Sequence, residues 1–287
     1  MEIILMPLIN GLSQAMLLFL IASGLTLVFG VLGILNFSHG AFFMLGAYFG
    51  YSMIQGTAVS PWLFFFIVIL SGIVVSVIGA LIEVLVLKRL YKVDEILSLL
   101  ATFAVLLILQ GLVHEIWGAS YLSVSFPQGL EGSINLGGMN VPAYSIVIIG
   151  AGFLVAALLW LLVQKTSFGK LIRASAEDSK MTNALGVNVP LIFTGVFILG
   201  AFLAGAAGMI AAPSTILTPM LSMTFIIQAF GVVIVGGLGN IFGAFIAALV
   251  LGLIDSYLTT FVPIFTGVAF FVGMVFILLI KPKGILS

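Results

Sequence analysis

The segment GILNFSHGAF, residues 33–42, sets an asparagine, a serine and a histidine side by side in an otherwise apolar sequence. Ser38 and His39 are residue types that can act as nucleophile and general base. Neighbouring residues on a helix do not face each other, so this pair is not expected to form a dyad. The only other histidine, His114, is expected near the opposite membrane face. With no H-E-x-x-H motif and no cysteine, zinc chemistry also lacks its ligands. We therefore expect no catalytic residue, no metal site and no cofactor bound by this chain.

The same segment allows two structural interpretations. Asn36 could cap a helix that starts at residue 37, with Gly33 and Gly40 permitting a tight turn at the inner membrane face. Alternatively, the helix is broken here and its freed backbone groups line a transport pathway. The residues placed on such a pathway are Asn36, Ser38, His39, Gln110, Gln228 and, in the similar segment GGLGNIFGAF, Gly237 and Asn240. Taken singly, the glutamines are equally suited to hydrogen bonds between helices.

A second unusual segment, GKLIRASAEDSKMTNALGVN, covers residues 169–188. Only 6% of the chain is charged, yet this segment contains five charged side chains. As one helix it would place Lys170, Arg173 and Glu177 on one face, continued by Lys180. Gly169 and Gly186 are the expected stop signals. The segment is either a solvated loop helix or a helix that docks a soluble protein. Its mixed signs favour a protein over anionic lipid.

The rest of the chain must position these residues inside a membrane. Hydrophobic residues make up 63% of the 287 positions, and the mean hydropathy is +1.40, well above a soluble domain. The net charge is zero, which gives no basis for nucleic-acid binding. The N-terminus lacks a basic region, so it is expected to be a retained span rather than a signal peptide. We expect an all-α, polytopic transmembrane bundle forming one domain over residues 1–287.

About 20 apolar residues are needed per transmembrane helix. The segments that meet this rule are 6–28, 36–56, 61–87, 95–117, 143–164, 190–212, 223–239, 241–259 and 263–280. This predicts about eight to nine spans, because the segments on either side of GGLGN could form one broken unit.

The basic residues predict the orientation. They fall into three groups: Lys88, Arg89 and Lys92; Lys165, Lys170, Arg173 and Lys180; Lys281 and Lys283. Nine spans place all three groups on one side, which the positive-inside rule assigns to the cytoplasm. The N-terminus is then outside and the C-terminus cytoplasmic. The external loop is 118–142, without lysine or arginine, and the cytoplasmic loop is 165–189.

Four segments in register resemble one family. RASAEDSKMTNALGVNV (173–189) resembles the cytoplasmic loop of branched-chain amino acid ABC transporter permeases of the LivH type. GLTLVFGVLGILNFSHGAFFMLGAY (24–48), VGGLGNIFGAFIAALVLGLID (235–255) and KPKGIL (281–286) resemble three further signatures of that family. The resemblance implies a bacterial or archaeal inner-membrane subunit that moves branched-chain or related hydrophobic amino acids. Urea, amides or other amino acids are alternative cargoes, and an ion-coupled secondary transporter is a further alternative.

The resemblance also implies partners. They are a paralogous LivM-like permease, two cytoplasmic ATPase subunits that bind ATP and Mg, and a periplasmic substrate-binding protein. Each permease seats an ATPase on a short coupling helix. The residues assigned to that contact are Lys170, Arg173, Ala176, Glu177, Asp178, Lys180, Ala184, Leu185 and Gly186. The absence of a G-x-x-x-x-G-K-[ST] motif fits hydrolysis of ATP by another chain. Whether two copies of this chain can pair is left open.

Overall fold

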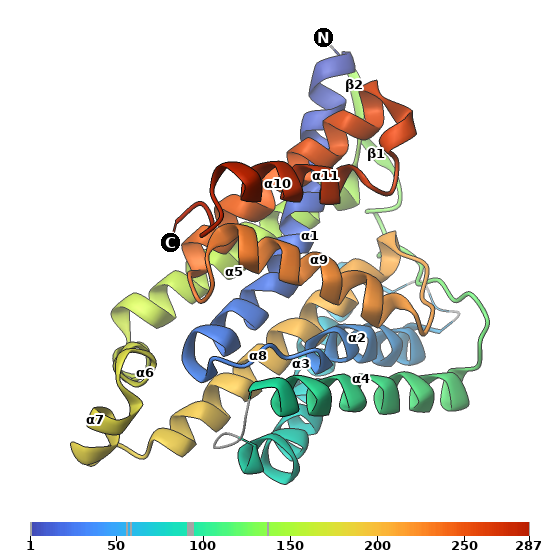
Figure 1. Cartoon of the computed structure of the whole chain (residues 1–287). Coiled ribbons are helices and arrows are strands. Elements are labelled where there is room, and N and C mark those ends of the chain that lie inside the picture. Colours follow the sequence, from blue (N-terminus) through green and yellow to red (C-terminus); the bar gives the residue numbers. More distant parts are fainter. Residues whose placement is uncertain (1, 56, 58, 91–94, 137, 287) are drawn as a thin grey trace.

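The fold is a bundle of long apolar helices, seen in a computed structural model that describes residues 2–55, 57, 59–90, 95–136 and 138–286 (Figure 1). The α-helices in these ranges are α1 (Glu2–Leu32), α2 (Ser38–Ile54), α3 (Pro61–Leu85), α4 (Glu95–Trp117), α5 (Ala143–Lys165), α6 (Ser167–Glu177), α7 (Ser179–Ala184), α8 (Val189–Ala211), α9 (Leu221–Gly236), α10 (Ile241–Phe261) and α11 (Ala269–Ile280). Short 3-10 helices lie at Leu87–Arg89, Ala212–Ser214 and Pro263–Phe265. A hairpin pairs β1 (Ser133–Leu136) with β2 (Met139–Pro142), antiparallel.

Each of the nine expected spans overlaps one of these helices, although α1 extends four residues beyond the expected 6–28 at each end. Six of them (α1, α3, α4, α5, α8 and α10) are long and apolar enough to cross a membrane. The other three are shorter, with 17, 16 and 12 residues in α2, α9 and α11. Lys92, from the first basic group, and Gly56, the expected end of the second span, lie outside the described residues.

Helix α1 forms the centre of the bundle and packs antiparallel to α10. Glycines at the crossing allow the backbones to approach: an added Cβ at Gly252 would meet Ala15 at 2.7 Å, and one at Gly30 would meet Gly239 at 2.9 Å. The Phe19 and Phe245 rings meet edge to face between these points, 5.1 Å apart. This register puts the start of α10 beside the end of α1.

Close contacts between small residues also fix α8 against α2. An added Cβ at Gly46 would lie 2.0 Å from the Gly205 carbonyl oxygen, and one at Gly208 would lie 1.9 Å from that of Phe43. The glycines of the segment GAFLAGAAG thus serve helix packing. Without a hydrophobic driving force between helices in lipid, such backbone approach is a main source of association.

The segment between α1 and α2 turns back into the bundle. Gly33 ends α1 with a positive φ of 68°, and residues 33–37 form no helix. His39, at the start of α2, lies 2.9 Å from the Ile21 carbonyl oxygen through its Nε2. Ile21 precedes the end of α1 by about 16 Å at 1.5 Å per residue. The segment is therefore a break inside the bundle rather than a turn at its end, and this shortens α2.

The similar segment GGLGN takes a different form. Gly237 and Gly239 adopt positive φ values of 102° and 82° and close a tight turn between α9 and α10. The C-terminal residues cover this turn, with Ile285 donating to the Val235 carbonyl at 2.8 Å and Asn240 donating to that of Leu286 at 2.9 Å. The turn thus lies at the end of the bundle that carries the C-terminus.

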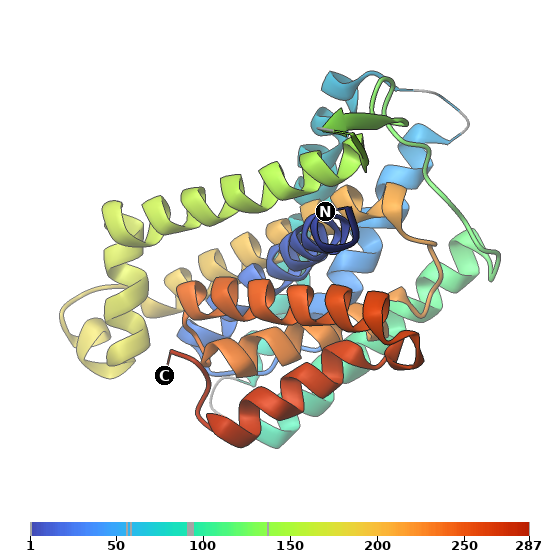
Figure 2. The ribbon, with the colours of Figure 1, turned by 90° about the horizontal axis from the view of Figure 1, so that it is seen from above.

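Two expected boundaries were wrong for identifiable reasons. The span expected at 223–239 ends at Gly236, because the positive φ of Gly237 cannot continue a helix. The span expected at 263–280 begins only at Ala269, because Pro263 starts a 3-10 turn and Gly267 has a φ of 84°. Figures 1 and 2 show α6, α7 and the C-terminus at one end of the bundle and the N-terminus away from them.

Candidate functional site: a charged end surface and a pocket at the other end

The charged segment forms two short helices rather than one. Thr166 caps α6 by accepting the Gly169 backbone N–H at 3.0 Å, so Gly169 lies inside the helix and is not a stop signal. Asp178 leaves the helical conformation, and its carboxylate accepts the Lys180 and Met181 N–H groups at 3.0 and 2.9 Å. Aspartate is favoured as an N-cap over a helix interior, which explains the break. The prediction of one continuous charged face was therefore wrong at Lys180.

The two helices are anchored by a few buried side chains. Ile172 is 4% exposed and Thr182 is 6% exposed. The Thr182 hydroxyl donates to the Ala174 carbonyl oxygen at 2.9 Å and holds α7 against α6. Gly186 ends the unit with a φ of 89°, as the predicted stop signal requires.

The outer surface of this unit, here called the end surface, consists of Met181 and the nine residues predicted to contact an ATPase. All nine are exposed: Lys170, Arg173, Ala176, Glu177, Asp178, Lys180, Ala184, Leu185 and Gly186. Two apolar side chains one helical turn apart also protrude from it, Met181 at 59% and Leu185 at 78% exposure. Arg173 differs from the other charges, because its guanidinium turns back to donate to the Val163 carbonyl of α5.

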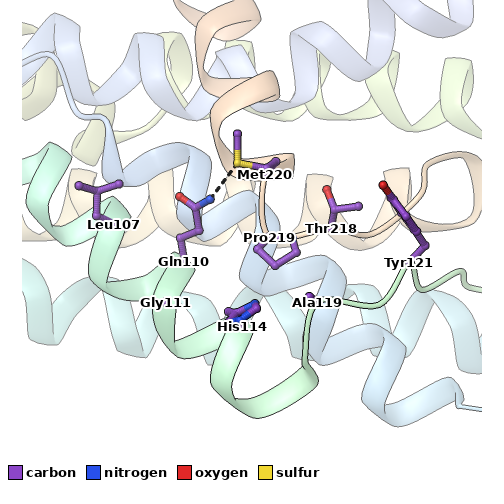
Figure 3. Close-up of a pocket in the computed structure, with 9 residues that line it drawn as sticks. All are labelled: Leu107, Gln110, Gly111, His114, Ala119, Tyr121, Thr218, Pro219 and Met220. Carbon is purple, nitrogen blue, oxygen red and sulfur yellow. Dashed lines mark hydrogen bonds between the residues drawn. The ribbon is translucent and has the colours of Figure 1, made fainter.

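A pocket of about 700 Å³ lies beside the C-terminal half of α4 (Figure 3). It lies between the C-terminal half of α4, the residues that follow it and the turn before α9. Its walls are Leu107, Gln110, Gly111, His114, Ala119, Tyr121, Thr218, Pro219 and Met220. Leu122 and Leu217 exchange two backbone hydrogen bonds of 3.1 and 2.8 Å, which join the two loops that carry Tyr121 and Thr218.

The pocket combines apolar walls with a few neutral polar groups. The Gln110 amide donates to the Met220 sulfur at 3.3 Å, while Thr218 and Tyr121 present hydroxyls from the facing loops (Figure 3). Neutral donors and acceptors beside aliphatic side chains suit a small ligand with both a polar and an apolar part. Sequence reasoning identified Gln110 but missed His114, Tyr121 and Thr218. The nearest signal was the prediction that residues 118–142, which include Tyr121, form an external loop.

The other predicted pathway residues lie elsewhere. Asn36, Ser38 and His39 are buried, and the Asn36 carboxamide oxygen accepts the Ser38 N–H at 3.1 Å and the Ser38 hydroxyl. Ser38 and His39 thus bond to other groups and not to each other. Within the described ranges, Asn36 Nδ2 and His39 Nδ1 have no hydrogen-bond partner.

Gln228 is half-buried in the middle of α9. Gly237 and Asn240 form the turn beside the C-terminus, where Asn240 caps α10 by accepting the Gly243 N–H at 2.9 Å. The pathway assignment of these residues stays a prediction.

The fold and the composition are those of a helical, multi-pass membrane protein. The family model described as "Branched-chain amino acid transport system / permease component" matches residues 8–280. The chain therefore belongs to this permease family.

Individual relatives agree with this assignment. The chain is 31% identical to the high-affinity branched-chain amino acid transport system permease protein BraD of Pseudomonas aeruginosa, over 99% of this chain and 95% of BraD. It is 27% identical to LivH of Escherichia coli, over 97% and 94% of the two chains. The ribose import permease protein RbsC of Haemophilus influenzae is 26% identical over 87% of this chain and 76% of RbsC. Among solved structures, PsaBC from Streptococcus pneumoniae in complex with Fab has a TM-score of 0.51 at 13% identity, covering 94% of this chain and 89% of that one. This last likeness concerns the fold.

Proposed function

We propose that this chain is the membrane-spanning subunit of an ATP-driven importer for branched-chain or related hydrophobic amino acids. It acts as one transmembrane domain in the inner membrane, with the N-terminus outside and the C-terminus in the cytoplasm. A paralogous permease completes the membrane part. Two separate subunits hydrolyse ATP, and a periplasmic binding protein delivers the substrate.

The observation that carries this proposal is the pair of exposed apolar side chains on the end surface. Met181 and Leu185 protrude from the most charged part of the chain, where water rather than lipid is the expected solvent. Exposed apolar groups ringed by polar residues are typical of a protein interface. Their charged neighbours on α6 and α7 supply the polar rim that such interfaces carry. The end surface therefore suits an ATPase subunit that binds α7 and transmits its movement to the bundle.

The pocket supports the substrate side of the proposal. Its volume falls within the roughly 300–1,000 Å³ range of small-molecule sites, and its neutral polar groups match a zwitterion with an aliphatic side chain. It opens between α4 and the turn at 218–220, on the end away from the end surface. Substrate released by a periplasmic binding protein would enter there.

Charge reversal on the end surface tests the coupling. Glu177→Lys should lower ATP-dependent uptake of leucine by about tenfold, the size expected from one lost interface ion pair in a docking patch. Insertion of the protein should be unchanged, because Glu177 is exposed. The matched control is Glu131→Lys, an exposed acid in the external loop, which should retain uptake.

Two outcomes would contradict the proposal. Normal uptake by the Glu177→Lys protein would remove the coupling assignment. Uptake by vesicles that contain the chain without any ATPase would instead favour an ion-coupled transporter. Competition of leucine uptake by urea or amides would shift the substrate class within the same family.

A further inference from the structure

A second cavity lies on the side of the bundle where α5 and α10 flank α1. It measures about 650 Å³. Its lining comes from α1, α5, α6, α10 and the turn that precedes α10, and includes Phe19, Phe153, Ala157, Trp160, Arg173 and Phe245. This cavity is called the lateral crevice below.

The floor of the lateral crevice is aromatic and aliphatic. Phe19 and Phe245 meet at 5.1 Å between ring centres, and Phe153 meets Phe245 at 5.7 Å. The rim is equally apolar but exposed, with Trp160 at 53% and Phe242 at 64% exposure. An apolar crevice with exposed apolar rims on a membrane helix is suited to hydrocarbon.

One end of the crevice is cationic. The Arg173 guanidinium reaches it from α6 while bonding to the Val163 carbonyl, which uses one of its five N–H groups. Lys165 ends α5 with its ammonium 5.6 Å from the centre of the Trp160 ring. Neither cation has a carboxylate partner among the residues that the structure describes. Gln164 and Asn240 add neutral polar groups at the same end.

The length of the crevice matches one leaflet. Phe153 and Gln164 are the first and last lining residues on α5, eleven positions apart, which is about 17 Å at 1.5 Å per residue. Half of the roughly 30 Å hydrocarbon core is about 15 Å. A group held by Arg173 and Lys165 at the membrane surface would therefore place a chain on Phe153 near the bilayer centre.

We propose that the lateral crevice binds one anionic phospholipid, with its phosphate between Arg173 and Lys165 and an acyl chain on Phe19, Phe153 and Phe245. The negative charge of the ligand follows from two cations, Arg173 in the lining and Lys165 beside the lining ring of Trp160. A zwitterionic headgroup would compensate only part of their charge. The lipid would contact α6 directly and so tie the charged helices to the membrane. The orientation proposed above would place this lipid in the cytoplasmic leaflet, but the binding itself does not depend on that orientation.

The test measures lipid retention by the purified transporter complex in detergent, using native mass spectrometry. The probes are phosphatidylglycerol and phosphatidylcholine with identical acyl chains. The unaltered protein should retain phosphatidylglycerol about tenfold better, as expected for two cations facing an anionic lipid. Ala157→Trp fills the crevice without changing its charge and should bring phosphatidylglycerol retention down to that of phosphatidylcholine. The combined change Lys165→Gln and Arg173→Gln should do the same.

The matched control is Leu154→Trp, which adds the same side chain to an exposed position of α5 outside the crevice and should retain the preference. Equal retention of the two lipids by the unaltered protein would overturn the proposal. An equal preference for phosphatidylglycerol over phosphatidylcholine in the Ala157→Trp and Leu154→Trp proteins would also overturn the proposal. Neither result depends on uptake or on ATPase binding, so a failure here is distinct from a failure of the proposed function.

Discussion

The Thr102 hydroxyl accepts the Phe37 backbone N–H at 3.2 Å and thereby joins α4 to the break between α1 and α2. The same hydroxyl lies 3.2 Å from the Leu35 carbonyl oxygen and 3.0 Å from that of Leu99. Thr102 is fully buried. A single buried side chain thus bonds to backbone groups of the non-helical segment that no helix satisfies.

Replacement of Thr102 by valine tests this role. Thr102→Val keeps the shape but leaves the Phe37 N–H without an acceptor, at a cost of about 1–3 kcal/mol. The expected result is a lower thermal unfolding midpoint in detergent. Thr102→Ser keeps the hydroxyl, so its unfolding midpoint should be closer to that of the unaltered protein. Equal midpoints for the valine and serine variants would show that the break is held by other contacts.

The break at Asp178 gives a second prediction. Asp178→Ala removes the acceptor of two N–H groups and should destabilise α7 locally by about 0.5–2 kcal/mol. Hydrogen exchange at the Lys180 and Met181 amides should accelerate, while exchange in α8 should not. Asp178→Asn retains a side-chain oxygen and serves as the control. If asparagine and alanine accelerate exchange equally, the negative charge rather than the cap stabilises α7.

Backbone contact between α2 and α8 gives a third prediction. Gly46→Ala forces a methyl group against the Gly205 carbonyl, and overpacking of this kind costs about 1–3 kcal/mol. The unfolding midpoint should fall. Gly150 is also helical, but an added Cβ there meets nothing within 4 Å. Alanine is favoured over glycine in a helix by roughly 1 kcal/mol. Gly150→Ala should therefore raise the unfolding midpoint slightly. The same sign for both variants would contradict the packing described here.

Filling the pocket gives a fourth prediction. Ala119→Trp places a large ring between His114 and Thr218 and should reduce uptake strongly, while binding of the ATPase subunit is retained. Ser120→Trp adds the same ring to the adjacent exposed residue that does not line the pocket and should have little effect. Uptake that is equal in the two variants would exclude the pocket from the substrate route.

Much of this arrangement was predictable from the sequence, because continuous apolar runs bounded by charged or glycine-rich segments mark the helices of membrane proteins. Each expected span overlaps a helix. The family resemblance is confirmed by the match over residues 8–280. The segment 33–37 was harder, since its depth depends on Ile21 and Thr102, which are distant in sequence. Two related glycine motifs then took different forms, an internal break and a tight end turn.

The site was predictable only in part. The charges of the end surface were visible as a composition change. The break at Asp178 was not, because an aspartate can lie inside a helix or cap the start of one, and the spacing of the charges fits a single helix. The pocket joins α4 to a turn about a hundred residues later in the chain. No spacing rule relates His114 to Thr218, so the sequence suggested Gln110 alone.

The central claim is that the end surface lies in the cytosol and is bound by an ATPase subunit. The chain has no cysteine, so a single Met181→Cys variant offers one thiol on the exposed face of α7. The measurement is thiol cross-linking to the copurified ATPase subunit, together with labelling of intact spheroplasts by a membrane-impermeant maleimide. Ile134→Cys in β1 is the external control. We expect Met181→Cys to cross-link and to stay unlabelled, while Ile134→Cys is labelled and does not cross-link. Labelling of Met181→Cys in intact spheroplasts would contradict the account.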